Sequence, residues 1–160
     1  MLNIKLICLG KLKEQYLRDM CAEYQKRLGG YCKFTLHELS PERLPDDPSP
    51  AQIAAALQKE AKQINALLSP DDKVMAMCIE GKMMSSEALS KKLEDYAVGG
   101  SGSVAFIIGS SFGLDPAVKA RADVRLSMSP MTFPHQLARA MLMEQIYRAL
   151  SISAGSKYHK

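Results

Sequence analysis

The chain has 160 residues and a mass of 17.6 kDa, with a net charge of +4 and an isoelectric point near 8.9. Hydrophobic residues make up 47% and charged residues 24%, ordinary values for one globular domain, so extensive disorder is excluded. No apolar run approaches the ~20 residues of a membrane span and no signal peptide is recognisable, so a cytoplasmic protein is expected. The slight basic excess is compatible with a nucleic acid partner but does not indicate one.

The first strand is expected from Leu2 to Gly10, and a helix follows from Lys11 to Leu28, where Gly29-Gly30 stops it. Residues at helical spacing would form its inward face: Leu12, Tyr16, Leu17, Met20, Tyr24 and Leu28. A second strand is predicted from Tyr31 to Leu39.

A loop follows, because four prolines fall within the ten residues from Pro41 to Pro50. Ser49 then caps a second helix, with Pro50 at its first position and Gln52 completing a capping box. The apolar positions of that helix have the spacing of one buried stripe: Ile53, Leu57, Ala61, Ile64 and Leu68.

A buried strand is predicted from Asp72 to Ile79, with a turn at Glu80-Gly81-Lys82. Ser85 or Ser86 caps the third helix, which continues to Tyr96. The next strand spans Ser103 to Ile108.

The last third of the chain begins with a glycine turn after that strand, and Asp115-Pro116 starts a short helix. An apolar and serine-rich strand, Arg125 to Phe133, leads into a helix from Pro134 to Ile152 and a short tail. This alternation predicts an α/β fold, a mainly parallel sheet with helices on both faces. Ligands of such sheets bind beyond the carboxyl ends of the strands.

Three glycines lie at strand ends. Gly10 and Gly81 are expected to serve positive φ angles, whereas Gly109 is expected to let a ligand approach the backbone. The segment from Gly109 to Gly113 also matches G-x-S-x-G, the nucleophile elbow of α/β-hydrolases. Two triads would be possible: Ser111 with Asp123 and His135, or Ser111 with Asp115 and His159. Too little chain follows Gly113 for the strands that normally deliver the acid and the histidine, so the hydrolase stays a minor alternative.

Several motifs occur together in order along the chain. They are the opening strand, I-E-G-K (Ile79 to Lys82), I-G-S-x-x-G-L (Ile108 to Leu114), the run from Ser127 to His135, and the terminal Tyr158-His159-Lys160. In this combination the whole chain resembles the RlmH family of SPOUT methyltransferases, which methylate a pseudouridine in 23S ribosomal RNA. One departure is Lys157, where the family often has proline, and a freer tail is expected from it.

The resemblance implies one SPOUT domain over residues 1–160, with a C-terminal trefoil knot and with residues 153–160 as a functional tail. It implies methyl transfer from S-adenosylmethionine to N3 of the pseudouridine, on the assembled ribosome. The cofactor would bind on apolar walls and backbone groups of three loops. The implied cofactor residues are Met77, Gly109, Met128, Ser129, Pro130, Met131, Thr132 and Phe133.

The implied catalytic residues lie near the end of the chain. His159 would remove the imide proton, since an unperturbed histidine titrates near working pH, and Tyr158 and Glu144 would accompany it. Arg148, Lys157 and Lys160 would bind phosphates of the RNA. His135 is expected to pack near the cofactor loop and His37 to be structural. Because the tail carries little apolar mass, stability is expected to depend on it only slightly.

The helix from Pro134 to Ile152 is apolar nearly all round, which predicts burial on more than one side. A homodimer would provide the second cover, as in the family that the chain resembles; enclosure within one subunit is the alternative. A non-catalytic RNA-binding knot protein also remains open. Neither a metal nor a disulfide is expected, because the cysteines lack metal-ligand spacing and lie in apolar surroundings: Cys8, Cys21, Cys32 and Cys78.

Overall fold

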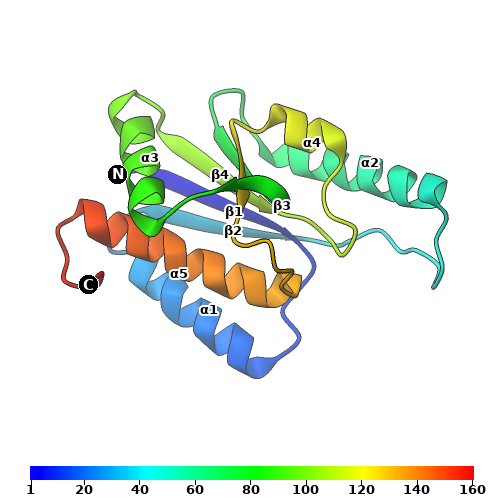
Figure 1. Cartoon of the computed structure of the whole chain (residues 1–160), viewed down its shortest axis with the longest axis horizontal. Coiled ribbons are helices and arrows are strands. Elements are labelled where there is room, and N and C mark those ends of the chain that lie inside the picture. The colour runs from blue at the N-terminus through cyan, green and yellow to red at the C-terminus, as the bar shows by residue number, and fades with distance from the viewer.

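Five parallel strands form the centre of the computed structural model, which describes all 160 residues (Figure 1). Their order across the sheet is β2-β1-β4-β3-β5. The strands are β1 (Asn3–Leu9), β2 (Lys33–Leu39), β3 (Lys73–Met83), β4 (Ser103–Ile108) and β5 (Val124–Ser127). The helices are α1 (Gln15–Leu28), α2 (Pro50–Leu67), α3 (Ser86–Val98), α4 (Pro116–Arg121) and α5 (His135–Ser153). The predicted parallel α/β architecture is therefore confirmed.

Helices cover both faces of the sheet, as Figure 1 shows: α1, α3 and α5 lie on one side, and α2 and α4 on the other. Alternate residues of β1 pack against the two helix layers, because successive side chains of a strand point to opposite faces of the sheet. Leu6 and Cys8 face the three-helix layer, and Ile7 and Leu9 face the two-helix layer. Both cores therefore depend on the central strands, which form near-continuous apolar runs.

Helix α5 lies between α1 and α3 and packs on the sheet. Its fully buried apolar residues are Ala140, Leu142, Met143, Ile146 and Ala149. Much of the all-round apolar surface that suggested a subunit interface is thus covered within one chain. Leu137 is 36% exposed and remains on the outer side.

The strand boundaries differ from the prediction around Gly81. Strand β3 does not end at Ile79 but continues to Met83, with an irregularity between Met77 and Lys82 where it pairs with β5. The predicted turn is therefore a bulged part of the strand. Gly81 also has no positive φ angle; instead, a Cβ atom there would lie 2.7 Å from the carbonyl oxygen of Arg125. The glycine is needed because two backbones pass in contact.

Among the other boundaries, the end of β5 and the start of α1 differ most from the prediction. The last strand is short, since β5 ends at Ser127 and residues 128–134 form a loop, although a strand to Phe133 was expected. Helix α1 begins at Gln15 and not at Lys11. The predicted capping box at Ser49 and Gln52 is present, with Ser49 Oγ accepting from the Gln52 backbone N–H at 3.2 Å.

The four cysteines are free and buried as expected. Burial raises the pKa of Cys8 to about 12 and that of Cys32 to about 11, so both thiols stay protonated at neutral pH. None of the helices combines the length and the apolar character that crossing a membrane requires.

Candidate active site

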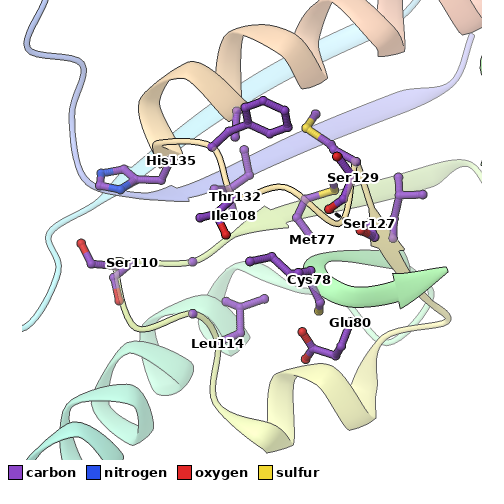
Figure 2. Close-up of a pocket in the computed structure, with 18 of the residues that line it drawn as sticks. Met77, Cys78, Glu80, Ile108, Ser110, Leu114, Ser127, Ser129, Thr132 and His135 are labelled. Atoms are coloured by element: carbon purple, nitrogen blue, oxygen red, sulfur yellow. Dashed lines mark hydrogen bonds between the residues drawn. The ribbon is translucent and has the colours of Figure 1, made fainter. Parts of the chain in front are cut away.

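A cavity of about 720 Å³ lies at the edge where β4 and β5 end and β3 bulges (Figure 2). Three loop regions and the start of α5 enclose it. Its wall residues come from 77–80 of β3, from 108–114 after β4, from 126–129 and 131–134 after β5, and from Lys119, His135 and Ala138. This is the edge at which parallel sheets bind ligands.

The predicted cofactor residues meet in this cavity. All of them except Pro130 line it, and they come from three segments far apart in the sequence. Figure 2 shows Met77, Ser129 and Thr132 around the same space. Sequence reasoning did not assign several other wall residues to the site: Cys78, Glu80, Ser110, Leu114, Lys119, Leu126 and Ser127.

The turn after β4 explains why residue 109 is glycine. A Cβ atom on Gly109 would lie only 2.3 Å from the carbonyl oxygen of Gly113, which real side chains do not tolerate. The turn is closed by a 2.9 Å hydrogen bond from the Gly113 N–H to the Ser110 carbonyl, and Gly113 has a φ of +84°. Gly109 is therefore required by the turn itself, whereas the sequence attributed it to the approach of a ligand.

The loop after β5 is held by its own serines. Ser127 Oγ donates to the Ser129 carbonyl at 3.1 Å, and the Met131 N–H donates to Ser129 Oγ at 3.0 Å. Ser127 is buried, while Met131 is 72% exposed. These contacts shape the part of the cavity wall that carries most of the predicted cofactor residues.

The charges at the cavity are compensated within the chain. Lys119 Nζ lies 2.6 Å from Glu80 Oε1, and this contact lowers the pKa of the Glu80 carboxyl. Burial, together with the positive charges of Arg139 and Lys13, lowers the pKa of His135. His135 thus lines the cavity as a neutral ring at pH 7, next to the loop of residues 128–134 that was predicted to bind the cofactor.

A buried arginine, which the sequence analysis did not identify, ties α5 to the neighbouring turn. Arg139 is 1% exposed, and its guanidinium donates to Glu38 Oε2 at 2.6 Å and to the Gly10 carbonyl at 2.8 Å. Gly10 has a φ of +114°, as predicted. The only sequence signal for this contact was a positive charge within an apolar helix.

The C-terminal tail is docked along α5, not free as Lys157 suggested. The Tyr158 ring stacks on Tyr147 with centroids 4.7 Å apart, and its hydroxyl donates to Glu144 Oε1 at 3.0 Å. Burial, a 3.4 Å contact between the Tyr24 and Tyr158 hydroxyls and the hydrogen bond to Glu144 raise the pKa of Tyr158. The expectation that stability hardly depends on the tail is therefore not supported by its contacts.

His159 is held at both ring nitrogens. Arg148 Nη1 lies 3.2 Å from Nδ1, and Glu87 Oε1 lies 2.8 Å from Nε2. Arginine can only donate, so Nδ1 accepts and Nε2 carries the proton that Glu87 accepts. Arg148 also pairs with Glu144 Oε1 at 2.6 Å. This side chain, which was predicted to bind an RNA phosphate, is therefore already paired within the chain. Lys157 and Lys160 are exposed and form no ion pair.

No residue of the tail lines the 720 Å³ cavity, and the C-terminus lies by the far end of α5 from that edge (Figure 1). A second cavity of about 400 Å³ lies between the two regions. Its wall includes Glu144 and Gln145, and it shares Met77, Leu126, Ser127 and Met128 with the first. The structure therefore brings the predicted cofactor residues together and separates them from Tyr158 and His159 of the same chain.

Neither hydrolase triad is assembled. Asp115 Oδ1 accepts from the Ala117 N–H, Asp123 Oδ2 accepts from the Val74 N–H, and His159 is bound as described. Ser111 makes no hydrogen bond to any of these groups or to His135, so the elbow motif has no general base. No group of three or more His, Cys, Asp or Glu residues is placed to hold a metal ion.

A parallel sheet with a cavity at the carboxyl edge of its strands is typical of ligand-binding α/β proteins, and comparison with known proteins specifies the family. A model described as "Predicted SPOUT methyltransferase" matches residues 2–159. Over 159 residues, 99% of this chain and all of each relative, the identity is 50% to ribosomal RNA large subunit methyltransferase H of Streptococcus thermophilus. It is 48% to the proteins of the same name from Bifidobacterium adolescentis and Streptococcus equi. The chain belongs to the SPOUT methyltransferases and, among them, to the family of these large-subunit methyltransferase H proteins.

Two solved structures support the fold. A probable methylase family protein from Haemophilus influenzae aligns with a TM-score of 0.53 at 13% identity, over 98% of this chain and 70% of that one. Ribosomal RNA small subunit methyltransferase E from Neisseria gonorrhoeae, bound to S-adenosyl methionine, aligns with a TM-score of 0.51 at 11% identity, over 91% and 65%. At such low identities the likeness establishes the fold alone.

Proposed function

We propose that this protein transfers a methyl group from S-adenosylmethionine to N3 of a pseudouridine in large-subunit ribosomal RNA, on the assembled ribosome. The observation that carries the proposal is the convergence of three separate loops, with seven of the eight residues predicted to bind the cofactor, on one cavity at the ligand-binding edge of the sheet. Family membership supports methyl transfer, and the names of the relatives support the ribosomal substrate.

The cavity suits the cofactor chemically. An adenosyl group needs a flat apolar slot with a few polar groups that set its orientation. Leu114, Leu126 and Met128 provide apolar walls, and the backbone of the loops after β4 and β5 would supply the hydrogen-bonding groups. The bound cofactor supplies an electrophilic methyl group, so the chain itself must position the acceptor base and remove its proton.

His159 is proposed as the base that removes the imide proton, with Tyr158 and Glu144 fixing its surroundings. In the docked tail the Nδ1 lone pair of His159 is occupied by Arg148. The histidine therefore has to leave Arg148 before it can accept a proton from the substrate. We interpret the docked tail as a resting arrangement, from which substrate binding releases His159, and Lys157 and Lys160 then meet the phosphates of the RNA.

A homodimer is proposed as the working unit. Helices α1 and α5 lie side by side, with the Lys13 N–H bound to Gln136 at one end and Tyr24 near Tyr147 at the other. Their outer surface keeps apolar side chains exposed: Tyr16 at 69%, Met20 at 37% and Leu137 at 36%. A second copy covering this surface would remove apolar area from water, and the tail of one chain would then complete the cavity of the other.

The dimer is tested by sedimentation at micromolar concentration, where a mass of about twice 17.6 kDa is expected. Met20→Glu should shift the protein towards monomer, while Val98→Glu, at an 83% exposed position on α3, should not. A persistent monomer with full activity would contradict the dimer.

Complementation tests the shared site. A variant with a blocked cavity (Thr132→Trp) and a variant that lacks residues 158–160 should each be inactive alone. Mixed after partial unfolding and refolding, they should regain activity, because each heterodimer then has one intact cavity facing one intact tail. A mixture that stays inactive although heterodimers form would place cavity and tail of the same chain in one site.

The reaction is tested with radiolabelled S-adenosylmethionine on ribosomes that lack the modification. Methyl transfer is expected on assembled ribosomes, and the modified nucleotide should be identified by mass spectrometry of 23S fragments. Free RNA and separated subunits serve as comparison substrates. RNA binding without any methyl transfer or cofactor binding would favour the non-catalytic alternative.

A further inference from the structure

A buried carboxylate stands directly behind the wall of the cofactor cavity. Glu60, in the middle of α2, is 4% exposed and takes part in none of the ion pairs of the structure. Its Oε2 accepts from the Glu42 backbone N–H at 2.9 Å, and its Oε1 accepts from the Ser110 hydroxyl at 2.9 Å. Ser110 lines the cavity, so one side chain of α2 connects the loop before that helix with the turn after β4.

The position of Glu60 is not explained by α2 packing alone. The buried apolar residues of the helix are Ala56, Ala61 and Ile64, and Glu60 is buried beside Ala61 on the same face. A buried carboxylate costs free energy unless hydrogen bonds compensate it, and here both compensating donors belong to loops at the ligand-binding edge. A leucine would fill the same space without this cost, but it would leave the Ser110 hydroxyl unoriented.

The hydrogen bond also fixes what Ser110 can offer to a ligand. A serine hydroxyl has one proton and two acceptor sites. Because Ser110 gives its proton to Glu60, towards the cavity its oxygen can only accept. We infer that Glu60 is a positioning residue for the cofactor: it turns the Ser110 oxygen into an acceptor for a hydrogen-bond donor of S-adenosylmethionine.

Such donors occur in both halves of the cofactor, as hydroxyl and amino groups of the nucleoside and as the ammonium of the amino acid. This inference rests on the proposed function, because it requires the cofactor in the cavity. Glu60 does not touch the cofactor itself. Its contribution must therefore disappear when the Ser110 hydroxyl is removed.

A double-mutant cycle tests this by calorimetric titration with S-adenosylhomocysteine, the demethylated product. Ser110→Ala should weaken binding by about tenfold, the common cost of leaving a buried donor unpaired. Glu60→Gln should weaken it by a similar factor, because the two donors bind different carboxylate oxygens and glutamine replaces one of these oxygens with an NH2 group that cannot accept. The double variant Glu60→Gln/Ser110→Ala should bind no more weakly than Ser110→Ala alone. Ser110→Thr, which keeps the hydroxyl, should restore most of the affinity.

Titration with 5′-methylthioadenosine, which lacks the amino acid half, distinguishes the two donors. If Ser110→Ala also lowers the affinity for this probe, the contact is assigned to the nucleoside. If the affinity for this probe is unchanged, the contact is assigned to the ammonium group. Losses that multiply in the double variant, or a Ser110→Ala protein that binds like the wild type, would overturn the inference while the proposed function stands. A Glu60→Gln protein that melts earlier but binds with unchanged affinity would do the same. A wild type that binds neither probe would overturn both.

Discussion

The 720 Å³ cavity, which we propose as the cofactor site, and the tail network lie on either side of the second cavity and are built from different kinds of contact. At the cavity, glycines with required conformations and serine hydrogen bonds within the loops fix the backbone. In the tail network, side chains of Glu144, Arg148, Tyr158 and His159 hold one another at part-buried positions. Because fixed backbone preorganises binding whereas partly solvated ion pairs contribute little energy, the first region suits a permanent site and the second a releasable one.

The largest effect should come from a substitution that disturbs the glycine turn at the cavity. Gly109→Val places side-chain atoms against the Gly113 carbonyl, so it should cost about 3 kcal/mol of unfolding free energy and abolish cofactor binding. Thermal melting and calorimetric titration measure the two effects. Gly102→Val is the matched control, because no atom lies within 4 Å of a Cβ built there. A Gly109→Val protein with wild-type stability would show that the turn is not constrained as described.

Substitutions in the tail should have the opposite effect: they should lower the rate of methyl transfer and leave cofactor affinity unchanged. His159→Ala should lower methyl transfer about 100-fold or more, the usual scale for a general base, with cofactor affinity unchanged. The rate is measured with ribosomes at saturating cofactor. His37→Ala, on the edge strand β2 and outside both cavities, is the matched histidine control. A rate within twofold of the wild type would remove His159 from catalysis.

A smaller effect is expected on stability. Tyr158→Ala removes the stacking on Tyr147 and the bond to Glu144, so it should cost about 1 kcal/mol. Chemical denaturation of this variant is compared with that of Lys157→Ala, which removes an exposed side chain of the same tail. Equal stabilities would mean that the tail is not docked in solution, as the sequence alone suggested.

The smallest effect concerns pH. The pKa of His135 is lowered by burial, so the unfolded chain binds a proton more readily than the folded one. The contribution of His135 to the unfolding free energy is therefore fully present above the ordinary histidine pKa of 6.5. It is lost as the pH falls below that value, because the unfolded chain then takes up a proton first. Unfolding free energy should decline more steeply from pH 7 to pH 5 in the wild type than in His135→Gln. Parallel declines would leave His135 without this role.

The sequence predicted the features that depend on local patterns. Strand and helix periodicity led to the correct fold class, and the motifs around Gly109 and Ser127 to His135 led to the cavity loops. It did not predict contacts between distant side chains, because a charged residue such as Glu60 or Arg139 does not indicate its partner. The bulge of β3 was not predicted for a related reason. Glycine is required at position 81 because its backbone lies against the backbone of Arg125, which is a neighbour only in the folded sheet.

The docking of the tail is a third case. Lys157 in place of proline argued for a loose end, but the position of Tyr158 depends on the face that α5 offers, with Glu144 and Tyr147 both turned towards the tail. Only the packing of α5 between α1 and α3 determines that face. The residues of the cavity and of the tail were therefore predictable as a list, but their separation in space was not.

The most direct test of the account is one calorimetric titration of S-adenosylmethionine into three proteins. The wild type and Val98→Trp, altered at an exposed site on α3, should bind with equal affinity. Thr132→Trp, which fills the cavity from its rim, should give no binding signal while its thermal transition stays cooperative. Equal binding by all three proteins, or no binding by the wild type, would contradict the claim that the 720 Å³ cavity is the cofactor site.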